Sequence, residues 1–134
     1  MTTFQQNLDL VTRGYEAFGS GNREAVLSLL QPDVVVEVHT DRPDIGSAEY
    51  HGHEGFLDNF AEIEDVFEDL VIEAGEITEH GDRLMVATRV SGRGKGSGVA
   101  IEARIFHVWT LRDGLAARLE VFSNGEQARA ALTA

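Results

Sequence analysis

The sequence predicts an α+β fold in which N-terminal helices pack on a curved, mostly antiparallel sheet that encloses a pocket. Apolar residues recur at helical spacing in the N-terminal half. The last third reads as three successive strands, Asp82–Ser91, Val99–Leu111 and Leu115–Ser123. One earlier strand, Val34–His39, follows the first helices and must join that sheet. Helices followed by a run of antiparallel strands are typical of α+β domains, and we expect a single domain over 1–134.

Two helices open the chain. The first ends at the turn Gly19-Ser20-Gly21, because these residues favour turns over helix. Asn22 can then cap the second helix, Arg23–Leu30, by accepting a hydrogen bond from a backbone N–H of its first turn. The first helix has one apolar face, formed by residues spaced three and four apart: Leu8, Val11, Tyr15 and Phe18.

A strand, a loop and a third helix follow. Pro32 favours extended backbone, and the β-branched run after it predicts the strand Val34–His39. Thr40–Tyr50 is expected to be a loop, and the third helix begins after Gly52. We expect this helix to lie across the concave side of the sheet. Its apolar face consists of Phe56, Phe60, Ile63 and Phe67.

The C-terminal half is expected to be a meander closed by a short helix. Leu70–Glu79 reads as a strand that ends at the turn His80-Gly81-Asp82. The later turns are the glycine-rich segment Gly92–Gly98 and Arg112-Asp113-Gly114. Ser123 and Glu126 have the spacing of a capping box, which predicts that a helix opens at Gln127–Leu132.

The composition excludes several classes of function. The net charge of −12 argues against nucleic acid and anionic membranes as partners, because phosphate contacts require clustered Lys and Arg. With no cysteine, the chain has neither disulfides nor thiolate nucleophiles or ligands. No apolar run reaches membrane-spanning length and the N-terminus does not resemble a secretion signal, so we expect a cytoplasmic protein.

Several segments together resemble the SnoaL-like branch of the NTF2-like superfamily. They occur in the expected order and extend over nearly the whole chain. The segments are Tyr15-Glu16-Ala17-Phe18 through Gly21-Asn22, Pro32-Asp33-Val34, Tyr50-His51-Gly52-His53-Glu54-Gly55, Gly92–Gly98, Val108-Trp109-Thr110-Leu111-Arg112-Asp113-Gly114 and Glu126-Gln127-Ala128. The resemblance implies a conical α+β barrel with a deep apolar pocket, commonly dimerised through the sheet. Relatives include polyketide cyclases, ketosteroid isomerases, epoxide hydrolases, dehydratases and non-catalytic proteins, so the fold does not define the reaction.

The catalytic groups of the isomerases are mostly absent at the corresponding positions. Their oxyanion-binding Tyr of the first helix falls on Gly14, with Tyr15 one residue away. Their general base, an Asp late in the first strand, falls on Val38. Their second oxyanion donor, an acid on the penultimate strand, falls on His107.

The acid of other relatives is absent as well. Polyketide cyclases and limonene-type epoxide hydrolases share an Asp on the last strand, which falls on Val121 here. These are ungapped counts, and a slip of one residue would place Glu37 or Glu120 in the site instead. His107 is therefore the polar group that the resemblance leaves at a pocket position.

His107 is the first catalytic candidate. Burial among Ile105, Trp109 and Leu119 would favour its neutral form, which can act as a general base or as an oxyanion donor. The alternative is a core histidine bound to a backbone carbonyl, or one at a dimer interface. His39 and Glu37 are further candidates, because both would line the pocket if their face of the strand points inward. The valines of the same strand favour the opposite orientation.

The expected ligand is a small hydrophobic molecule. Arg89 could bind an anionic group of it, although pairing with Glu102 or Arg104 on a solvated face is the simpler interpretation. His51 and His53 lack an evident third ligand, so no metal site is expected. The other residues expected to shape the pocket are Tyr15, Phe18, Phe56, Phe60, Trp109, Leu119 and Val121.

The sequence leaves the function open between an enzyme and a non-catalytic protein. The first hypothesis is binding of a small hydrophobic ligand, with cofactor-independent acid–base chemistry of the isomerase or cyclase type on a polyketide-like or steroid-like carbonyl compound. The alternatives are a non-catalytic ligand-binding protein and a protein-interaction module with a collapsed pocket. The resemblance also implies a homodimer for the first hypothesis, whereas the interaction module would use its sheet face to bind a partner chain.

Overall fold

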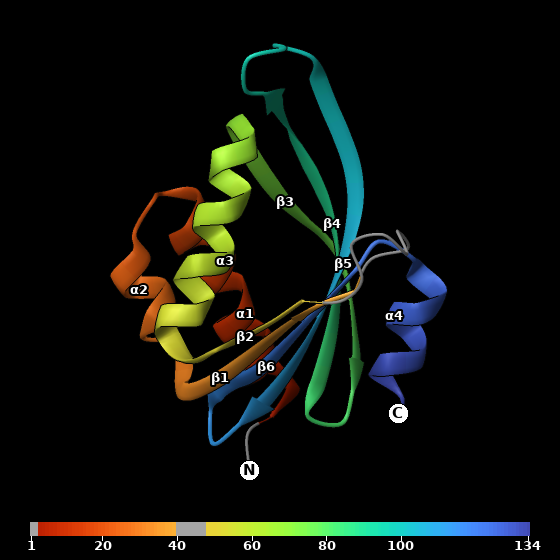
Figure 1. The fold of residues 1–134 in the computed structure, drawn as a ribbon. Helices are drawn as coiled ribbons and strands as arrows, with labels where there is room; N and C mark the ends of the chain where they lie inside the picture. Colours follow the sequence, from red (N-terminus) through yellow and green to blue (C-terminus); the bar gives the residue numbers. More distant parts are fainter. Residues whose placement is uncertain (1–2, 40–47) are drawn as a thin grey trace.

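The computed structural model describes residues 3–39 and 48–134 and shows helices on both faces of a curved, six-stranded sheet (Figure 1). The strands are β1 (Leu30–Val38), β2 (Ala48–His51), β3 (Phe67–His80), β4 (Arg83–Gly94), β5 (Ala100–Arg112) and β6 (Leu115–Phe122). Their order in the sheet is β2-β1-β6-β5-β4-β3, and β1 with β6 is the parallel pair. The expected α+β cone is present, but the sheet does not close into a barrel.

Three helices cover the concave face of the sheet and one covers the other face (Figure 1). The helices are α1 (Phe4–Gly19), α2 (Arg23–Leu27), α3 (Gly52–Val66) and α4 (Gly125–Leu132). α3 packs against β1, as expected for a helix that crosses the concave side, whereas α4 packs against β4, β5 and β6. None of the helices in the described ranges is long and apolar enough to cross a membrane.

Side-chain caps mark the starts of α1, α2 and α4, whereas α3 has none, and one of these caps differs from the expectation. Asn22 caps α2 as predicted, accepting a hydrogen bond from the Ala25 N–H at 3.1 Å. The cap of α4 is Asn124 and not Ser123, because the Asn124 carboxamide oxygen accepts from the N–H groups of Glu126 and Gln127 at 2.8 and 3.1 Å. The helix therefore begins at Gly125, earlier than the predicted Gln127.

The first strand is longer at its start than the sequence indicated. α2 ends at Leu27 and not at Leu30, because Leu30 already pairs with Ala116 of β6. The expected loop Thr40–Tyr50 is partly wrong: Ala48–His51 is the edge strand β2, antiparallel to β1. Strand β2 is too short to show a period in the sequence. Residues 40–47 lie outside the described ranges.

Alternation along β4 and β5 divides the apolar residues between two cores. Leu84 and Val86 face the helical layer and belong to the larger core, with α1, α3 and β1. Met85 and Val108, offset by one residue, face α4 and join a smaller core with Phe122. His107 and Trp109 therefore point to the concave side, since they flank Val108 on β5.

One close approach between β3 and β4 requires glycine. A Cβ added at Gly75 would lie 2.8 Å from the Ala87 carbonyl oxygen, beside the irregular register between Ala74 and Ile77. We expect Gly75→Ala to lower the free energy of unfolding by about 1–3 kcal/mol, because the two strands must separate. Urea denaturation of the variant and the wild type measures this difference.

Gly19→Ala is the matched control for this substitution. A Cβ at Gly19 meets no heavy atom within 4 Å, and the residue lies in α1 without a positive φ. Alanine there should be neutral or should stabilise by about 0.5–1 kcal/mol. Equal effects of the two substitutions would contradict the assigned strand contact.

Candidate functional site

A cavity of about 310 Å³ lies between the helical layer and the concave face of the sheet. Its size is within the range of pockets that hold small organic molecules. On β5, every second residue from Ile101 to Trp109 lines it, which is the period of a strand with one face inward. Among the described residues, the lining contains no Asp, Glu, Lys or Arg. The cavity therefore suits an uncharged, largely apolar molecule.

Three side chains form a hydrogen-bonded chain on the cavity wall. The Tyr15 hydroxyl lies 2.6 Å from His107 Nδ1, and Trp109 Nε1–H donates to the same hydroxyl at 3.1 Å. The rings of Tyr15 and His107 are nearly parallel, with centroids 5.9 Å apart. The apolar face of α1 directs Tyr15 toward the sheet, and the alternation of β5 places His107 and Trp109 opposite it.

The hydrogen-bond roles in this chain determine the tautomer of His107. An indole N–H can only donate, so the Tyr15 oxygen accepts from Trp109. Among the described residues, Nδ1 of His107 is the acceptor within reach of the Tyr15 proton, so we assign this proton to the bond with a neutral His107, whose own ring proton is then on Nε2. Within the described residues, Nε2 has no hydrogen-bond partner, so this N–H is available to a ligand in the cavity.

Burial keeps both titratable members of the chain uncharged. Desolvation lowers the pKa of His107 from 6.5 to about 4. Desolvation also raises the pKa of the Tyr15 hydroxyl well above its usual value, and the hydrogen bond from Trp109 opposes this only in part. At neutral pH His107 is thus a neutral hydrogen-bond donor and a weak base.

Nearly all the residues expected to shape the pocket lie around this cavity. Phe60 is the centre of an aromatic cluster, 4.7 Å from Phe18 and 4.9 Å from Phe56 between ring centroids. The expected residues that line the cavity are Tyr15, Phe18, Phe56, Phe60, Trp109, Leu119 and Val121. Arg89 does not line it, because its Nε forms a 3.2 Å ion pair with Glu102 on the exposed face.

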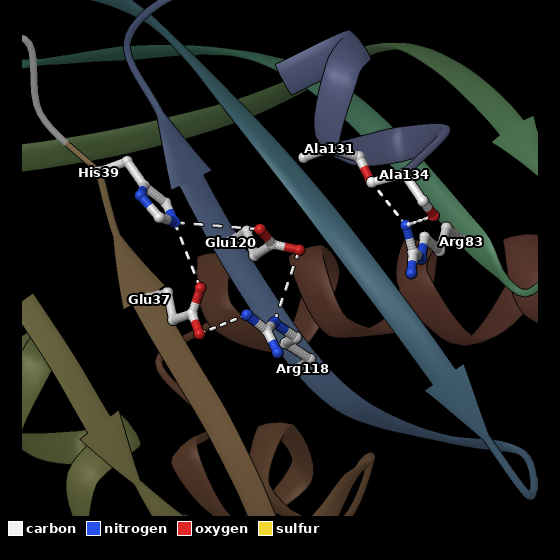
Figure 2. A network of polar contacts seen from close by, with 7 residues as sticks. All are labelled: Glu37, His39, Arg83, Arg118, Glu120, Ala131 and Ala134. Carbon is white, nitrogen blue, oxygen red and sulfur yellow. Dashed lines mark hydrogen bonds and ion pairs between the residues drawn. The ribbon is translucent and has the colours of Figure 1, made fainter. Parts of the chain in front are cut away.

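Glu37 and His39 lie on the opposite face of β1 from the cavity. Val38, between them, lines the cavity, so neither Glu37 nor His39 can act on a water beside His107. They belong instead to a polar cluster with Arg118 and Glu120 of β6 (Figure 2). His39 Nε2 lies 3.3 Å from Glu37 Oε2 and 3.9 Å from Glu120 Oε2.

This cluster is the group of side chains in the described ranges that could hold a metal ion. The candidate ligand atoms of Glu37, His39 and Glu120 all lie within 4.8 Å of one another. Arg118 already pairs with both carboxylates, through Nη2 to Glu37 and Nε 3.5 Å from Glu120 (Figure 2). A cation would have to displace this guanidinium, so the geometry favours an ion-pair network.

The orientation of β1 and β6 shows which of their residues occupy the positions where the relatives are expected to carry catalytic acids. Val38 pairs with Val121, and both line the cavity, whereas Glu37 pairs with Glu120 on the other face. The ungapped counts therefore hold at these two positions, and neither Glu37 nor Glu120 enters the site. On α1, Tyr15 and not Gly14 supplies the hydroxyl, although both line the cavity.

Sequence reasoning missed two polar residues of the lining, Asn59 on α3 and Ser91 on β4. Asn59 lies between Phe56 and Phe60 in sequence and shares the apolar face predicted for this helix from its phenylalanines and Ile63. A polar residue at core spacing on an amphipathic helix was the available signal. Ser91 adjoins the glycine-rich turn and borders the cavity, but it pairs with Glu102, so the alternation of β4 directs its side chain to the other face of the sheet.

A second cavity of about 590 Å³ shares part of its wall with the first, including Phe18 and Phe60. Its remaining lining is more polar, and one of its cations, Arg23, forms a 2.5 Å ion pair with Glu64. The first cavity is the better candidate site, because the buried chain of Tyr15, His107 and Trp109 borders it and not the second.

Comparison with known proteins finds one matching family and several proteins of similar structure. A family model described as the SnoaL-like domain matches residues 11–119. The crystal structure of TerC co-crystallised with polyporic acid is 26% identical, with a TM-score of 0.74 over 95% of this chain and 97% of that chain. No curated protein matches the chain significantly.

Two candidate polyketide cyclases are similar in structure. The one from Sinorhizobium meliloti is 28% identical with a TM-score of 0.67, and the alignment covers 84% of this chain and 93% of that chain. The SnoaL-like one from Jannaschia sp. CCS1 has a TM-score of 0.76 over 97% of this chain and 93% of that chain. At 21% identity, this second likeness supports the fold alone.

The buried, neutral state of His107 makes stability depend on pH. The folded state binds fewer protons than the unfolded state between pH 6.5 and 4, since folding lowers the pKa of this group. This contribution is fully present above pH 6.5 and is lost as the pH falls through 4. We expect a loss on the order of 3 kcal/mol, which His107→Gln should remove.

Denaturant titrations of the wild type and His107→Gln across this pH range measure the effect. The other groups titrate alike in both proteins, so the difference between the two curves isolates His107. A difference that stays constant from pH 4 to 7 would show that His107 is not buried in its neutral form.

Proposed function

The chain belongs to the SnoaL-like domain family, and on that premise we propose that it binds a small, neutral, hydrophobic carbonyl compound in the cavity beside His107. The expected effect on the ligand is polarisation of its carbonyl group by a hydrogen bond from His107 Nε2–H. Such a bond favours enol and enolate forms, which are intermediates of isomerisation and cyclisation.

The hydrogen-bonded chain of Tyr15, His107 and Trp109 is the observation that carries this proposal. It fixes the orientation of the imidazole and leaves one N–H donor toward an apolar cavity. In a site with low dielectric, a fixed donor interacts strongly with negative charge that develops on an oxygen atom. A ligand that fills the cavity also displaces the water that would otherwise compete for the donor.

The charge-free lining supports a second candidate, a non-catalytic ligand-binding protein. Abstraction of a proton from carbon requires a base near the ligand, and no carboxylate of the described residues lines the cavity. His107 is a poor base, because Nδ1 already accepts the Tyr15 proton and burial lowers its pKa. As an enzyme, the protein would therefore act through His107 as the oxyanion donor, with the α-proton of the ketone taken up by a base from the solvent.

Other observations bear on the class of ligand and on the remaining alternative. TerC, which resembles this chain over nearly its full length, was co-crystallised with an organic molecule, polyporic acid. Two further relatives of the fold are candidate polyketide cyclases. The hypothesis of a protein-interaction module predicts a filled pocket, and the cavity of about 310 Å³ argues against this hypothesis.

We also propose a homodimer, with a contact through exposed apolar residues at one end of the molecule. Val66 and Val99 meet the same turn, because their carbonyl oxygens accept from Lys95 and Gly94 N–H groups at 3.0 Å. We name the hairpin-end patch as Val66, Val99 and Ile101, each at least 39% exposed. A single domain over 1–134 and a cytoplasmic location stay predictions.

Removal of the His107 donor tests the ligand proposal. With α-tetralone as the probe, we expect His107→Leu to weaken binding about tenfold, because the carbonyl loses its hydrogen bond. His107→Gln keeps an N–H donor and should retain part of the affinity. Tetralin, which has the same apolar body without a carbonyl, should bind all three proteins equally, and calorimetry compares them.

Deuterium exchange at the α-carbon of the ketone separates the enzyme from the binding protein. If the wild type accelerates exchange and His107→Leu loses about 100-fold of that acceleration, the protein is a catalyst. If α-tetralone binds without faster exchange, the non-catalytic alternative holds. The proposal as a whole fails if wild-type protein shows no preference for α-tetralone over tetralin.

Sedimentation velocity tests the dimer. We expect the wild type to sediment as a dimer at micromolar concentration and Val99→Lys to shift it toward monomer, because a charge would enter an apolar contact. Thr12→Lys, on the exposed part of α1, adds the same charge outside the hairpin-end patch and should leave the dimer intact. A wild-type protein that sediments as a monomer would contradict the proposed dimer contact.

A further inference from the structure

We propose that Asn59 is a second ligand-recognition residue, which selects hydrophobic carbonyl compounds that also carry a hydroxyl group. This inference rests on the proposed function, since it assumes that the cavity beside His107 holds the ligand. It adds a polar contact from α3, on the helical wall, to the contact from β5 on the sheet wall.

The environment of Asn59 is unusual for an amide side chain. The residue is only 9% exposed and lies on α3 in the aromatic face formed by Phe56, Phe60 and Ile63. All four residues line the cavity. In the described ranges, no side chain or backbone group forms a hydrogen bond with the Asn59 carboxamide. A buried amide without a partner costs about 1–3 kcal/mol, so a partner is expected.

The carboxamide is not sealed within the protein. Among the described residues, Arg118 Nε is the side-chain atom that is both fully enclosed and without a hydrogen bond. The Asn59 nitrogen and oxygen are therefore in contact with open space, and the cavity is the space that this residue borders. A ligand that enters the cavity displaces water from this amide and must replace its hydrogen bonds.

The chemistry of an amide defines the matching group on the ligand. Asn offers an acceptor oxygen and a donor NH₂, and a hydroxyl complements both because it can donate and accept. A carboxylate or ammonium group is a poor match, since no charged side chain of the described residues lines the cavity to neutralise it. The ligand class is thus a neutral hydroxyketone with an apolar ring system.

The two polar contacts lie on different layers of the fold. His107 belongs to the sheet, whereas Asn59 belongs to α3, which packs over β1 on the concave side (Figure 1). A flat ring system between the layers can direct its ketone to His107 and its hydroxyl to Asn59. Ser91, the other polar residue missed, is a weaker candidate because its pairing with Glu102 places its side chain on the opposite face of the sheet.

A matched pair of ketones tests the role of Asn59. The probes are α-tetralone and a hydroxy-α-tetralone that carries a phenolic hydroxyl on the aromatic ring. We expect wild-type protein to bind the hydroxyketone about tenfold more tightly, and Asn59→Leu to abolish this preference while it keeps the affinity for α-tetralone. Ala61→Leu, on the exposed face of α3, introduces the same side chain outside the cavity and is the control that should keep the preference.

Stability of the unliganded variant gives an independent measurement. Leucine has the same branched heavy-atom skeleton as asparagine and needs no hydrogen bond, and its larger volume can extend into the cavity that Asn59 borders, so Asn59→Leu should leave the thermal midpoint unchanged or raise it. A fall of about 4 °C or more would show that the carboxamide has a structural partner and would overturn the inference.

The binding outcomes separate this inference from the proposed function. If wild-type protein binds both ketones equally, or if Asn59→Leu keeps the preference, Asn59 does not recognise the ligand, although carbonyl binding at His107 stands. If neither ketone binds the wild type in preference to tetralin, the proposed function fails and this inference fails with it.

Discussion

The shared hydroxyl of Tyr15 is the interaction on which the candidate site depends. It accepts a hydrogen bond from Trp109 and, as a phenol with a single proton, donates to His107. This arrangement links α1 to β5 across the interior and fixes the tautomer of the histidine. It also explains how a polar chain persists in an apolar wall, because the phenol and the indole each satisfy their hydrogen-bonding groups inside the protein. Only the outward nitrogen of His107 depends on what the cavity contains.

The pairing of β1 with β6 controls the electrostatics of the site. Because strand side chains alternate between faces, the register that places Val38 and Val121 in the cavity places Glu37 and Glu120 on the other side. There the two carboxylates are held by Arg118 and lie close to His39. The acids thus adjoin the two cavity-lining valines in sequence but are separated from the cavity by the thickness of the sheet. The cavity consequently has no fixed charge in the described lining, and its chemistry is limited to neutral donors and acceptors.

Local patterns predicted the meander and the helix α1 well, because both have long periodic segments and strong turn residues. Asp113 and Gly114 adopt positive φ angles of 53° and 79°, as the turn between β5 and β6 requires. The sequence did not reveal β2, since four residues carry no period, or the early start of β1, since Leu30 is recruited by Ala116 from a distant strand. For the site residues, too, local patterns could be predicted from the sequence and long-range contacts could not. His107 was identified from its apolar neighbours on one strand, whereas its bond to Tyr15 spans 92 positions and requires knowledge of how α1 packs on the sheet.

His107 and Asn59, the polar groups on the two walls of the cavity, differ in whether the protein itself supplies a hydrogen-bond partner. His107 is held from behind by Tyr15, so its free N–H has a fixed direction before any ligand arrives. Asn59 has no such support among the described residues, so its carboxamide can rotate to suit the group it meets. A fixed donor stabilises developing charge because no reorganisation is needed at that moment. An adaptable amide contributes little to that effect but can distinguish ligands by the presence of a hydroxyl, since an unmatched amide stays unpaired when water is displaced. The structure therefore separates the group suited to carbonyl polarisation from the group suited to selection, and it places them on different layers of the fold.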